Sequence, residues 1–112
     1  MLKRNVLRKK TDFDSIYKRG KSVGDRFVVL FYRPNGLAYN RTGFLASKKV
    51  GNSVQRNRAK RLMKESYRKM EGKLPTGYDF IIIARNTING KKCAEVEKSL
   101  YSAFKRTGVR KK

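Results

Sequence analysis

The side chains most able to bind a ligand are concentrated between residues 48 and 69, in the stretch KKVGNSVQRNRAKRLMKESYRK. Lysine and arginine dominate it, and Glu65 is its only acid. A lysine ammonium group binds phosphate as a point charge, whereas the planar guanidinium of arginine binds it through two parallel hydrogen bonds. The chemistry that this stretch indicates is the binding of a polyanion.

Residues that would support catalysis by the protein itself are scarce. The chain has no histidine and only eight carboxylates, spread along its length. A protein-only nuclease usually needs histidine acid–base chemistry or clustered carboxylates that hold metal ions. We therefore expect neither a catalytic residue nor a metal site on this chain.

The overall composition supports a folded protein with a polyanionic partner. The 112 residues suffice for one domain with a modest core, and a hydrophobic content of 38% is too high for a disordered tail. A formal net charge of +22 opposes a compact state unless a polyanion is bound. Nucleic acid is the favoured partner, and an anionic membrane surface is the weaker alternative.

Nothing in the sequence indicates a membrane or secretory protein. No apolar run approaches the length of a membrane span, and the start MLKRNVLRKK lacks the apolar core of a signal peptide. The single cysteine, Cys93, excludes an intramolecular disulfide and a cysteine-based zinc cluster. It is expected to be a small packing residue. A cytoplasmic location is expected.

The basic stretch must be positioned by the elements around it. Hydrophobic periodicity and turn residues predict helices over residues 11–20, 54–70 and 92–106, and strands over residues 26–32, 42–47 and 78–85. The first two strands are expected to form a loose hairpin, and the third, YDFIIIAR, to be central. The strand–helix–strand unit implies a parallel pair, so the fold class is α+β with a mixed sheet.

Capping residues set the expected helix boundaries. Thr11 and Asp14 have the spacing of a capping box for the first helix, and Gly20 is expected to end it. Ser53 is expected to cap the second helix. Within the first helix, Phe13, Ile16 and Tyr17 share one face; Ile16 is expected in the core, and one of the two aromatics can remain exposed.

Turning 100° per residue from Ala59 divides the second helix into two sides. The core side collects Ala59, Leu62, Met63, Ser66, Tyr67 and Met70. The opposite side collects Asn57, Lys60, Arg61, Lys64 and Arg68, with Arg56 and Arg58 on its flanks. Solvated faces usually mix charges of both signs, and this one offers few acids, which favours polyanion binding.

The stretch SKKVGNSVQRNRAKRLMKESYR resembles the signature of the bacterial ribonuclease P protein subunit, K-x-G-N-x-V-x-R-N-x-x-K-R. The fixed positions of that signature are all filled here, by Lys49, Gly51, Asn52, Val54, Arg56, Asn57, Lys60 and Arg61. The starting segment, the strand IIIAR and the final amphipathic helix also match the family plan, so the resemblance spans nearly the whole chain.

The resemblance implies an αββαβα sandwich of the ribosomal protein S5 domain 2-like type, as one domain over residues 1–112. Its strand–helix–strand crossover is left-handed, which general topology rules disfavour. The family is the protein partner of a catalytic RNA, ribonuclease P RNA, and the two together remove the 5′ leader from precursor tRNA. The RNA holds the Mg²⁺ ions and performs the hydrolysis, so this chain would carry no catalytic residue and require no stable protein partner.

The resemblance also implies site residues. Contacts to the catalytic RNA would come from Arg56, Asn57, Arg58, Lys60, Arg61, Lys64 and Arg68 on the second helix, and from Lys48, Lys49 and Asn52 before it. The single-stranded leader would lie in an aromatic-lined cleft between the first helix and the sheet, at Phe13, Tyr17 and Phe31. The register of the first strand leaves open whether Phe31 or Tyr32 lines that cleft. A basic arm, residues 1–10, would offer further phosphate contacts through Lys3, Arg4, Arg8, Lys9 and Lys10.

Three other functions fit parts of the sequence. A structural RNA-binding protein, such as a ribosomal protein, suits the charge, size and fold class, and only the signature argues against it. A DNA-binding module would need base-reading side chains, whereas the basic face is uniformly suited to phosphate. A protein-only ribonuclease would have to cleave RNA in the absence of any RNA cofactor.

Overall fold

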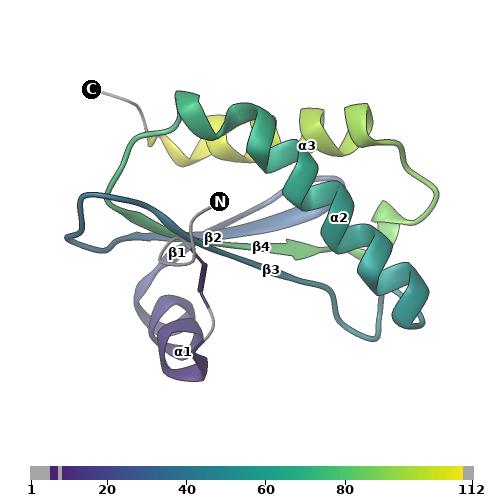
Figure 1. The fold of residues 1–112 in the computed structure, drawn as a ribbon, viewed down its shortest axis with the longest axis horizontal. Coiled ribbons are helices and arrows are strands. Elements are labelled where there is room, and N and C mark those ends of the chain that lie inside the picture. The colour runs from purple at the N-terminus through teal and green to yellow at the C-terminus, as the bar shows by residue number, and fades with distance from the viewer. Residues whose placement is uncertain (1–5, 8, 110–112) are drawn as a thin grey trace.

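The computed structural model describes residues 6–7 and 9–109, which form a four-stranded sheet with helices on both faces (Figure 1). The main elements are α1 (Lys10–Arg19), β1 (Lys21–Gly24), β2 (Val28–Pro34), β3 (Arg41–Leu45), α2 (Ser53–Met70), β4 (Tyr78–Ala84) and α3 (Cys93–Thr107). Two short 3-10 turns, η2 (Glu71–Lys73) and η3 (Asn86–Ile88), flank β4. The predicted α+β class is confirmed.

The sheet has the order β1-β2-β4-β3. The β3–β4 pair is parallel and the other two pairs are antiparallel, so the predicted mixed sheet is confirmed. β4 is central because Phe80, Ile81 and Ile82 bury both of its faces completely. The expected hairpin of β2 with β3 is wrong, because β4 lies between them and pairs with both.

The strand β1 was not predicted from the sequence. Its four residues, KSVG, are mostly exposed, and they carry too little apolar character to show a pattern. The strand forms because it follows α1 directly and pairs with the edge of β2, from Lys21 opposite Tyr32 to Gly24 opposite Val29.

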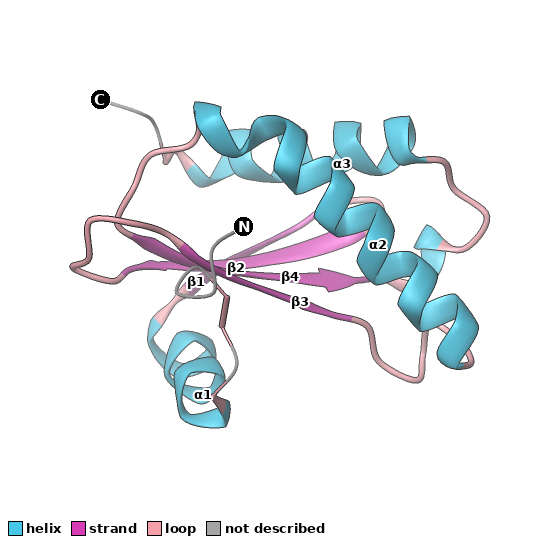
Figure 2. Cartoon of the chain, viewed as in Figure 1, coloured by secondary structure: helices cyan, strands magenta, loops and turns pink. Residues whose placement is uncertain are grey.

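The helices α2 and α3 lie over one face of the sheet and α1 over the other (Figure 2), and an apolar cluster fills the space on each face. The larger one fills the space between the sheet and the helices α2 and α3, and the smaller one lies under α1 and includes Leu7, Ile16 and Ile81. Residues alternate between the clusters along β2, so Leu30 belongs to the larger and Phe31 packs against the smaller.

The start of α1 differs from the prediction. The helix begins at Lys10 with Lys9 as its N-cap, without a side-chain cap, so the expected capping box of Thr11 and Asp14 is wrong. The chain that leads into α1 is held instead by Leu7, which is buried and donates its N–H to the Thr42 carbonyl at 3.1 Å. Of the predicted basic arm, Lys3, Arg4 and Arg8 lie outside the described residues.

Gly20 ends α1, as predicted, and the reason is steric. It has an extended backbone, and its N–H donates to the Ile16 carbonyl at 2.7 Å. A Cβ at this position would lie 2.6 Å from the Ile16 carbonyl oxygen and 2.9 Å from that of Tyr32. Only glycine therefore lets the chain turn this closely from α1 onto the sheet.

A buried carboxylate ties α1 to the sheet. Asp79 of β4 is fully buried and accepts two hydrogen bonds from the Arg41 guanidinium, at 2.9 and 2.8 Å, and one from the Asn35 amide at 2.9 Å. Arg33 lies 3.7 Å from the same carboxylate and donates to the Ser15 hydroxyl of α1 at 2.6 Å. The cluster thus joins three strands to α1.

Asp79→Ala should lower the free energy of unfolding by about 3–5 kcal/mol, because it leaves two half-buried arginines without their shared anion. Urea denaturation followed by circular dichroism measures the loss. Asp14→Ala is the matched control, since Asp14 is exposed on α1 and its loss should change stability by no more than about 0.5 kcal/mol. Equal effects of the two substitutions would contradict a structural role for Asp79.

Candidate nucleic-acid interface

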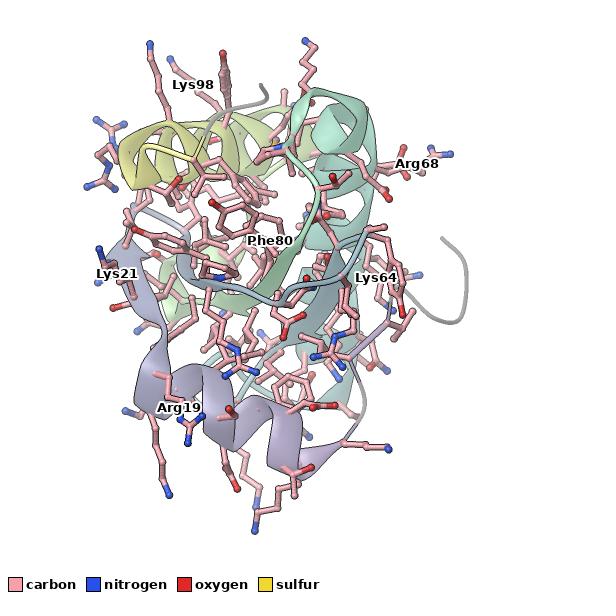
Figure 3. The ribbon with its side chains drawn as sticks, turned by 90° about the vertical axis from the view of Figure 1, so that its left-hand side faces the viewer. Arg19, Lys21, Lys64, Arg68, Phe80 and Lys98 are labelled. Carbon is pink, nitrogen blue, oxygen red and sulfur yellow. The ribbon has the colours of Figure 1, made fainter. Side chains whose placement is uncertain are left out.

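The outer face of α2 is a row of exposed polar and cationic side chains. Asn57, Arg61, Lys64 and Arg68 follow one another at helical spacing and all are exposed. Figure 3 places Phe80 in the interior and Arg68 at the surface of the helical layer. Glu65 is the only acid in α2, and its carboxylate binds the Arg68 guanidinium at 2.6 Å. The face is thus strongly positive.

The opposite side of α2 anchors the helix. Ala59, Met63, Ser66, Tyr67 and Met70 are buried as predicted, whereas Leu62 is half-buried at the margin of the core. The Tyr67 hydroxyl accepts a hydrogen bond from the Thr42 hydroxyl at 3.0 Å. Burial raises the pKa of Tyr67 to about 12, so this side chain stays neutral at physiological pH.

Arg56 and Arg58, predicted on the flanks of α2, are half-buried, and so is Lys60, which was predicted on the outer side. Arg58 donates to the Lys91 carbonyl at 2.7 Å and so ties α2 to the segment that precedes α3. Its guanidinium has a structural partner, which the sequence pattern did not reveal. The exposed cations of the outer face, Arg61, Lys64 and Arg68, therefore project from a helix whose other side is buried against the core.

The beginning of α2 corrects one prediction and explains part of the signature. The N-cap is Asn52 and not Ser53: the Asn52 side chain accepts from the Gln55 N–H at 3.0 Å, and the Gln55 side chain accepts from the Asn52 N–H at 2.9 Å. Gly51 has φ +142°, and a Cβ there would lie 1.8 Å from the Gln55 Oε1 atom. Glycine is therefore required at position 51, and Asn52 supplies the side-chain acceptor of this capping box.

Lys48 and Lys49 are exposed in the turn just before this cap. The turn is held by the Val50 N–H, which donates to the Ser47 carbonyl at 3.0 Å, and by the buried side chain of Val50. The Asn89 amide also donates to the Val50 carbonyl at 2.5 Å. Both lysines therefore stand beside the start of α2, and they extend its positive face.

The aromatic cluster, defined as Phe13, Tyr17 and Phe31, lies on the other face of the sheet. The rings of Tyr17 and Phe31 meet edge to face, with their centroids 5.0 Å apart, and Tyr17 is 40% exposed. Phe13 packs over Gly43 of β3, where a Cβ would lie 2.9 Å from its ring. Burial, and to a lesser degree the Asp14 carboxylate, raises the pKa of Tyr17, so its hydroxyl remains a donor.

The register of β2 shows which of Phe31 and Tyr32 faces α1, which the sequence left open. Phe31 faces α1, whereas Tyr32 packs against the larger apolar cluster and donates its hydroxyl to the Thr107 carbonyl at 3.4 Å. Phe31 therefore belongs to the aromatic cluster and Tyr32 does not.

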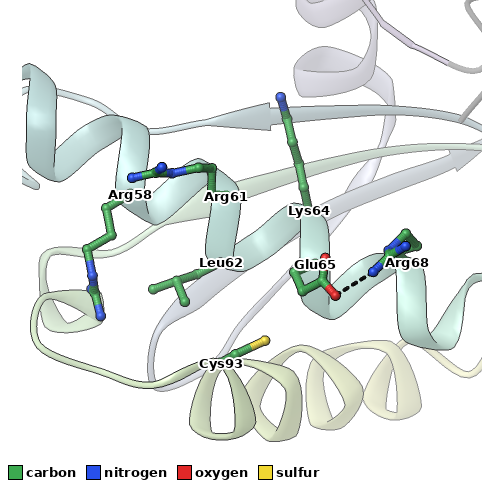
Figure 4. Close-up of a pocket in the computed structure, with 7 residues that line it drawn as sticks. All are labelled: Arg58, Arg61, Leu62, Lys64, Glu65, Arg68 and Cys93. Atoms are coloured by element: carbon green, nitrogen blue, oxygen red, sulfur yellow. Dashed lines mark hydrogen bonds and ion pairs between the residues drawn. The ribbon is translucent and has the colours of Figure 1, made fainter.

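A groove between α2 and α3 was not expected from the sequence (Figure 4). It is lined by Arg58, Arg61, Leu62, Lys64, Glu65, Arg68 and Cys93. Cys93, predicted as a packing residue, does contact the Ser66 hydroxyl at 3.7 Å, but its thiol also faces the groove. The pattern of a single helix cannot reveal a groove that needs two helices side by side.

The part of the chain that the structure describes contains neither a metal-ligand cluster nor a membrane-spanning helix. No group of three or more His, Cys, Asp or Glu side chains there could hold a metal ion. Among the described helices, none has the length and apolar character needed to cross a membrane.

A positively charged helix face on a small α+β domain, with one exposed and two half-buried aromatic rings on a second surface, is typical of nucleic-acid-binding proteins. The family model described as Ribonuclease P matches residues 1–108. The ribonuclease P protein component of Alkaliphilus metalliredigens is 46% identical over 100 residues, which cover 89% of this chain and 90% of that protein. The corresponding protein of Clostridium botulinum (strain Loch Maree) is 44% identical over 109 residues, covering 96% and 98%.

Solved structures agree with these sequence matches. The RNase P protein of Staphylococcus aureus superposes with a TM-score of 0.85 at 32% identity, covering 95% of this chain and 97% of that one. The RNase P protein of Thermotoga maritima gives 0.81 at 33% identity, covering 89% and 94%. The chain therefore belongs to the family of ribonuclease P protein components.

Asn52→Ala should lower the free energy of unfolding by about 0.5–2 kcal/mol, because the first turn of α2 loses its side-chain acceptor. Asn52→Asp keeps an acceptor of the same geometry and should leave stability within a few tenths of a kcal/mol of the parent. Urea denaturation of the two variants provides the comparison. Equal stability of Asn52→Ala and the parent would show that the cap contributes nothing.

Proposed function

We propose that this chain is the protein subunit of a ribonuclease P ribonucleoprotein and that it binds the catalytic RNA through α2. The observation that carries the proposal is the outer face of α2, where Glu65 is the only acid of the helix. Arg61 and Lys64 are exposed there, and neither forms an ion pair with an acid among the described residues. Because like charges at i, i+3 and i+4 repel, such a face favours a bound polyanion. The family membership selects ribonuclease P RNA as that polyanion.

The aromatic cluster is proposed to bind the 5′ leader of precursor tRNA. Tyr17 and Phe31 offer ring surface beside the sheet, and unstacked bases stack on aromatic rings with about 1–3 kcal/mol each and little sequence preference. Such tolerance suits a subunit that must accept many different leaders. The half-buried apolar side chains beside the cluster, Leu45 and Ile83, extend this surface.

The two surfaces lie on opposite faces of one sheet, because α2 covers one face and α1, which carries Phe13 and Tyr17, covers the other (Figure 1). The described part of the chain measures 36 × 27 × 24 Å. A rigid body of this size would hold the leader at a fixed distance from the RNA that binds α2. Its contribution to cleavage would be the positioning of the substrate, which lowers the entropic part of the barrier.

The hydrolysis itself is proposed to belong to the RNA. The described residues offer no carboxylate cluster that fits a magnesium ion, so Mg²⁺ would be held mainly by RNA phosphates. When bound there, it would activate the attacking water and stabilise the leaving oxygen. This chain would supply binding and orientation only.

Substitutions on the two faces should separate the two roles. Tyr17→Ala should weaken binding of precursor tRNA to the holoenzyme by about 5- to 150-fold, which corresponds to the loss of one stacking contact, and should spare mature tRNA.

Arg61→Ala should instead weaken assembly with the RNA and make the log–log salt dependence of that assembly shallower by about 0.9 or less. Fluorescence titration of each complex supplies both values.

Tyr101→Ala is the matched control for Tyr17, because Tyr101 is 54% exposed on α3, on the far side of the sheet from the aromatic cluster. It should leave the preference for precursor over mature tRNA unchanged. Equal losses of precursor and mature tRNA on Tyr17→Ala would identify Tyr17 as a packing residue and refute its contact with the leader.

A further inference from the structure

The groove between α2 and α3 combines two kinds of surface. Its rim carries four cations from one helix, Arg58, Arg61, Lys64 and Arg68, and its apolar part comes from Leu62 of α2 and Cys93 of α3. Figure 4 shows Leu62 on the side of α2 that faces α3, with Arg61 and Lys64 above it and Arg58 and Arg68 on either side. Its volume of about 570 Å³ lies within the ~300–1,000 Å³ range of small-ligand pockets.

The walls of the groove are held in place. Arg58 is fixed at one end by its hydrogen bond to the Lys91 carbonyl at 2.7 Å. At the other end the Glu65 carboxylate holds the Arg68 guanidinium at 2.6 Å, as the dashed line in Figure 4 marks. The Lys69–Glu97 ion pair at 3.5 Å and the Cys93–Ser66 contact at 3.7 Å join the two helices beside it.

This arrangement fits an unpaired nucleotide better than it fits a duplex. A continuous duplex presents phosphates to the rim, but its bases are stacked and paired, so the apolar part would stay empty. An unpaired nucleotide presents a flat base that can lie on apolar groups while its flanking phosphates meet the arginines.

We propose that the α2–α3 groove receives one unpaired nucleotide of the RNA that binds α2. Its base lies against Leu62 and Cys93, and its flanking phosphates are bound by Arg61 and Arg68. Glu65 acts as a positioning residue for Arg68. The inference rests on the proposed binding of ribonuclease P RNA along α2 and specifies what that RNA places between the two helices.

The single cysteine of the chain makes the groove accessible to a direct test. The rate at which a small thiol reagent modifies Cys93 is measured in the free protein and at saturating ribonuclease P RNA. The rate should fall by about tenfold or more with RNA, because only the small unbound fraction then reacts. A fully paired RNA duplex at saturating concentration should leave the rate nearly unchanged, since it has no free base.

A control thiol separates local from general protection. In a Cys93→Ser background, Ser102→Cys places the thiol on the other flank of α3, beside Asp25 and Phe27 and away from α2. This thiol should remain reactive in the RNA complex. Equal protection of both positions, or equal protection of Cys93 by the duplex, would overturn the inference.

Assembly is followed in the same samples, so that the two proposals fail differently. If a complex forms while Cys93 stays fully reactive, the proposal that a nucleotide occupies the groove is refuted and the proposed function is unaffected. If no complex forms with the folded protein, the proposed function fails and the inference fails with it. The supporting result is protection of Cys93 in the RNA complex while the control thiol at position 102 stays reactive. In Arg61→Ala, the protection of Cys93 should weaken together with assembly.

Discussion

The burial of one side of α2 against the sheet is the interaction on which the rest of the structure depends. Met63 and Tyr67 are almost completely buried, and they fix the rotation of the helix about its axis. Because that rotation is fixed, Arg61 and Lys64 must point to solvent. A chain with a net charge of +22 thus keeps its cations at the surface and its core apolar, at the cost of repulsion that a polyanion would relieve.

The sheet turns this single anchored helix into a two-sided molecule. β4 is buried on both faces, so each face can carry its own helical layer and its own surface. The Asp79 cluster then fixes α1, which brings Tyr17 against Phe31. The arrangement places a cationic surface and an aromatic surface on opposite sides of a rigid body, which is what the proposed positioning role requires.

Much of the fold could be predicted, because local patterns determine it. The two sides of α2 follow from helical periodicity, the central place of β4 follows from its apolar run, and the signature from Lys49 to Arg61 identifies the family. The boundaries were less predictable: Asn52 replaces Ser53 as the cap because Gln55 completes a capping box with it. Sequence alone did not reveal that the Gln55 side chain of this capping box lies too close to residue 51 for any residue other than glycine.

What could not be predicted depends on contacts between distant segments. β1 exists because β2 offers a free edge, and Asp79 accepts hydrogen bonds from Asn35 and Arg41, which lie 44 and 38 positions away in the sequence. The α2–α3 groove likewise needs Cys93 opposite Leu62, and no single-helix pattern contains that pairing. Of the site, the cationic face was visible in the sequence, whereas the structural role of Arg58 and the choice of Phe31 over Tyr32 required the fold.

The function proposed for this protein is to assist a catalytic RNA. Its most direct test is the cleavage of precursor tRNA by a bacterial ribonuclease P RNA at low magnesium concentration, with and without the purified protein. We expect the RNA alone to cleave poorly and the folded protein to restore removal of the 5′ leader, while the protein alone stays inactive. No stimulation by the folded protein would contradict the account and favour a structural RNA-binding role, and cleavage by RNA-free protein would contradict it as well.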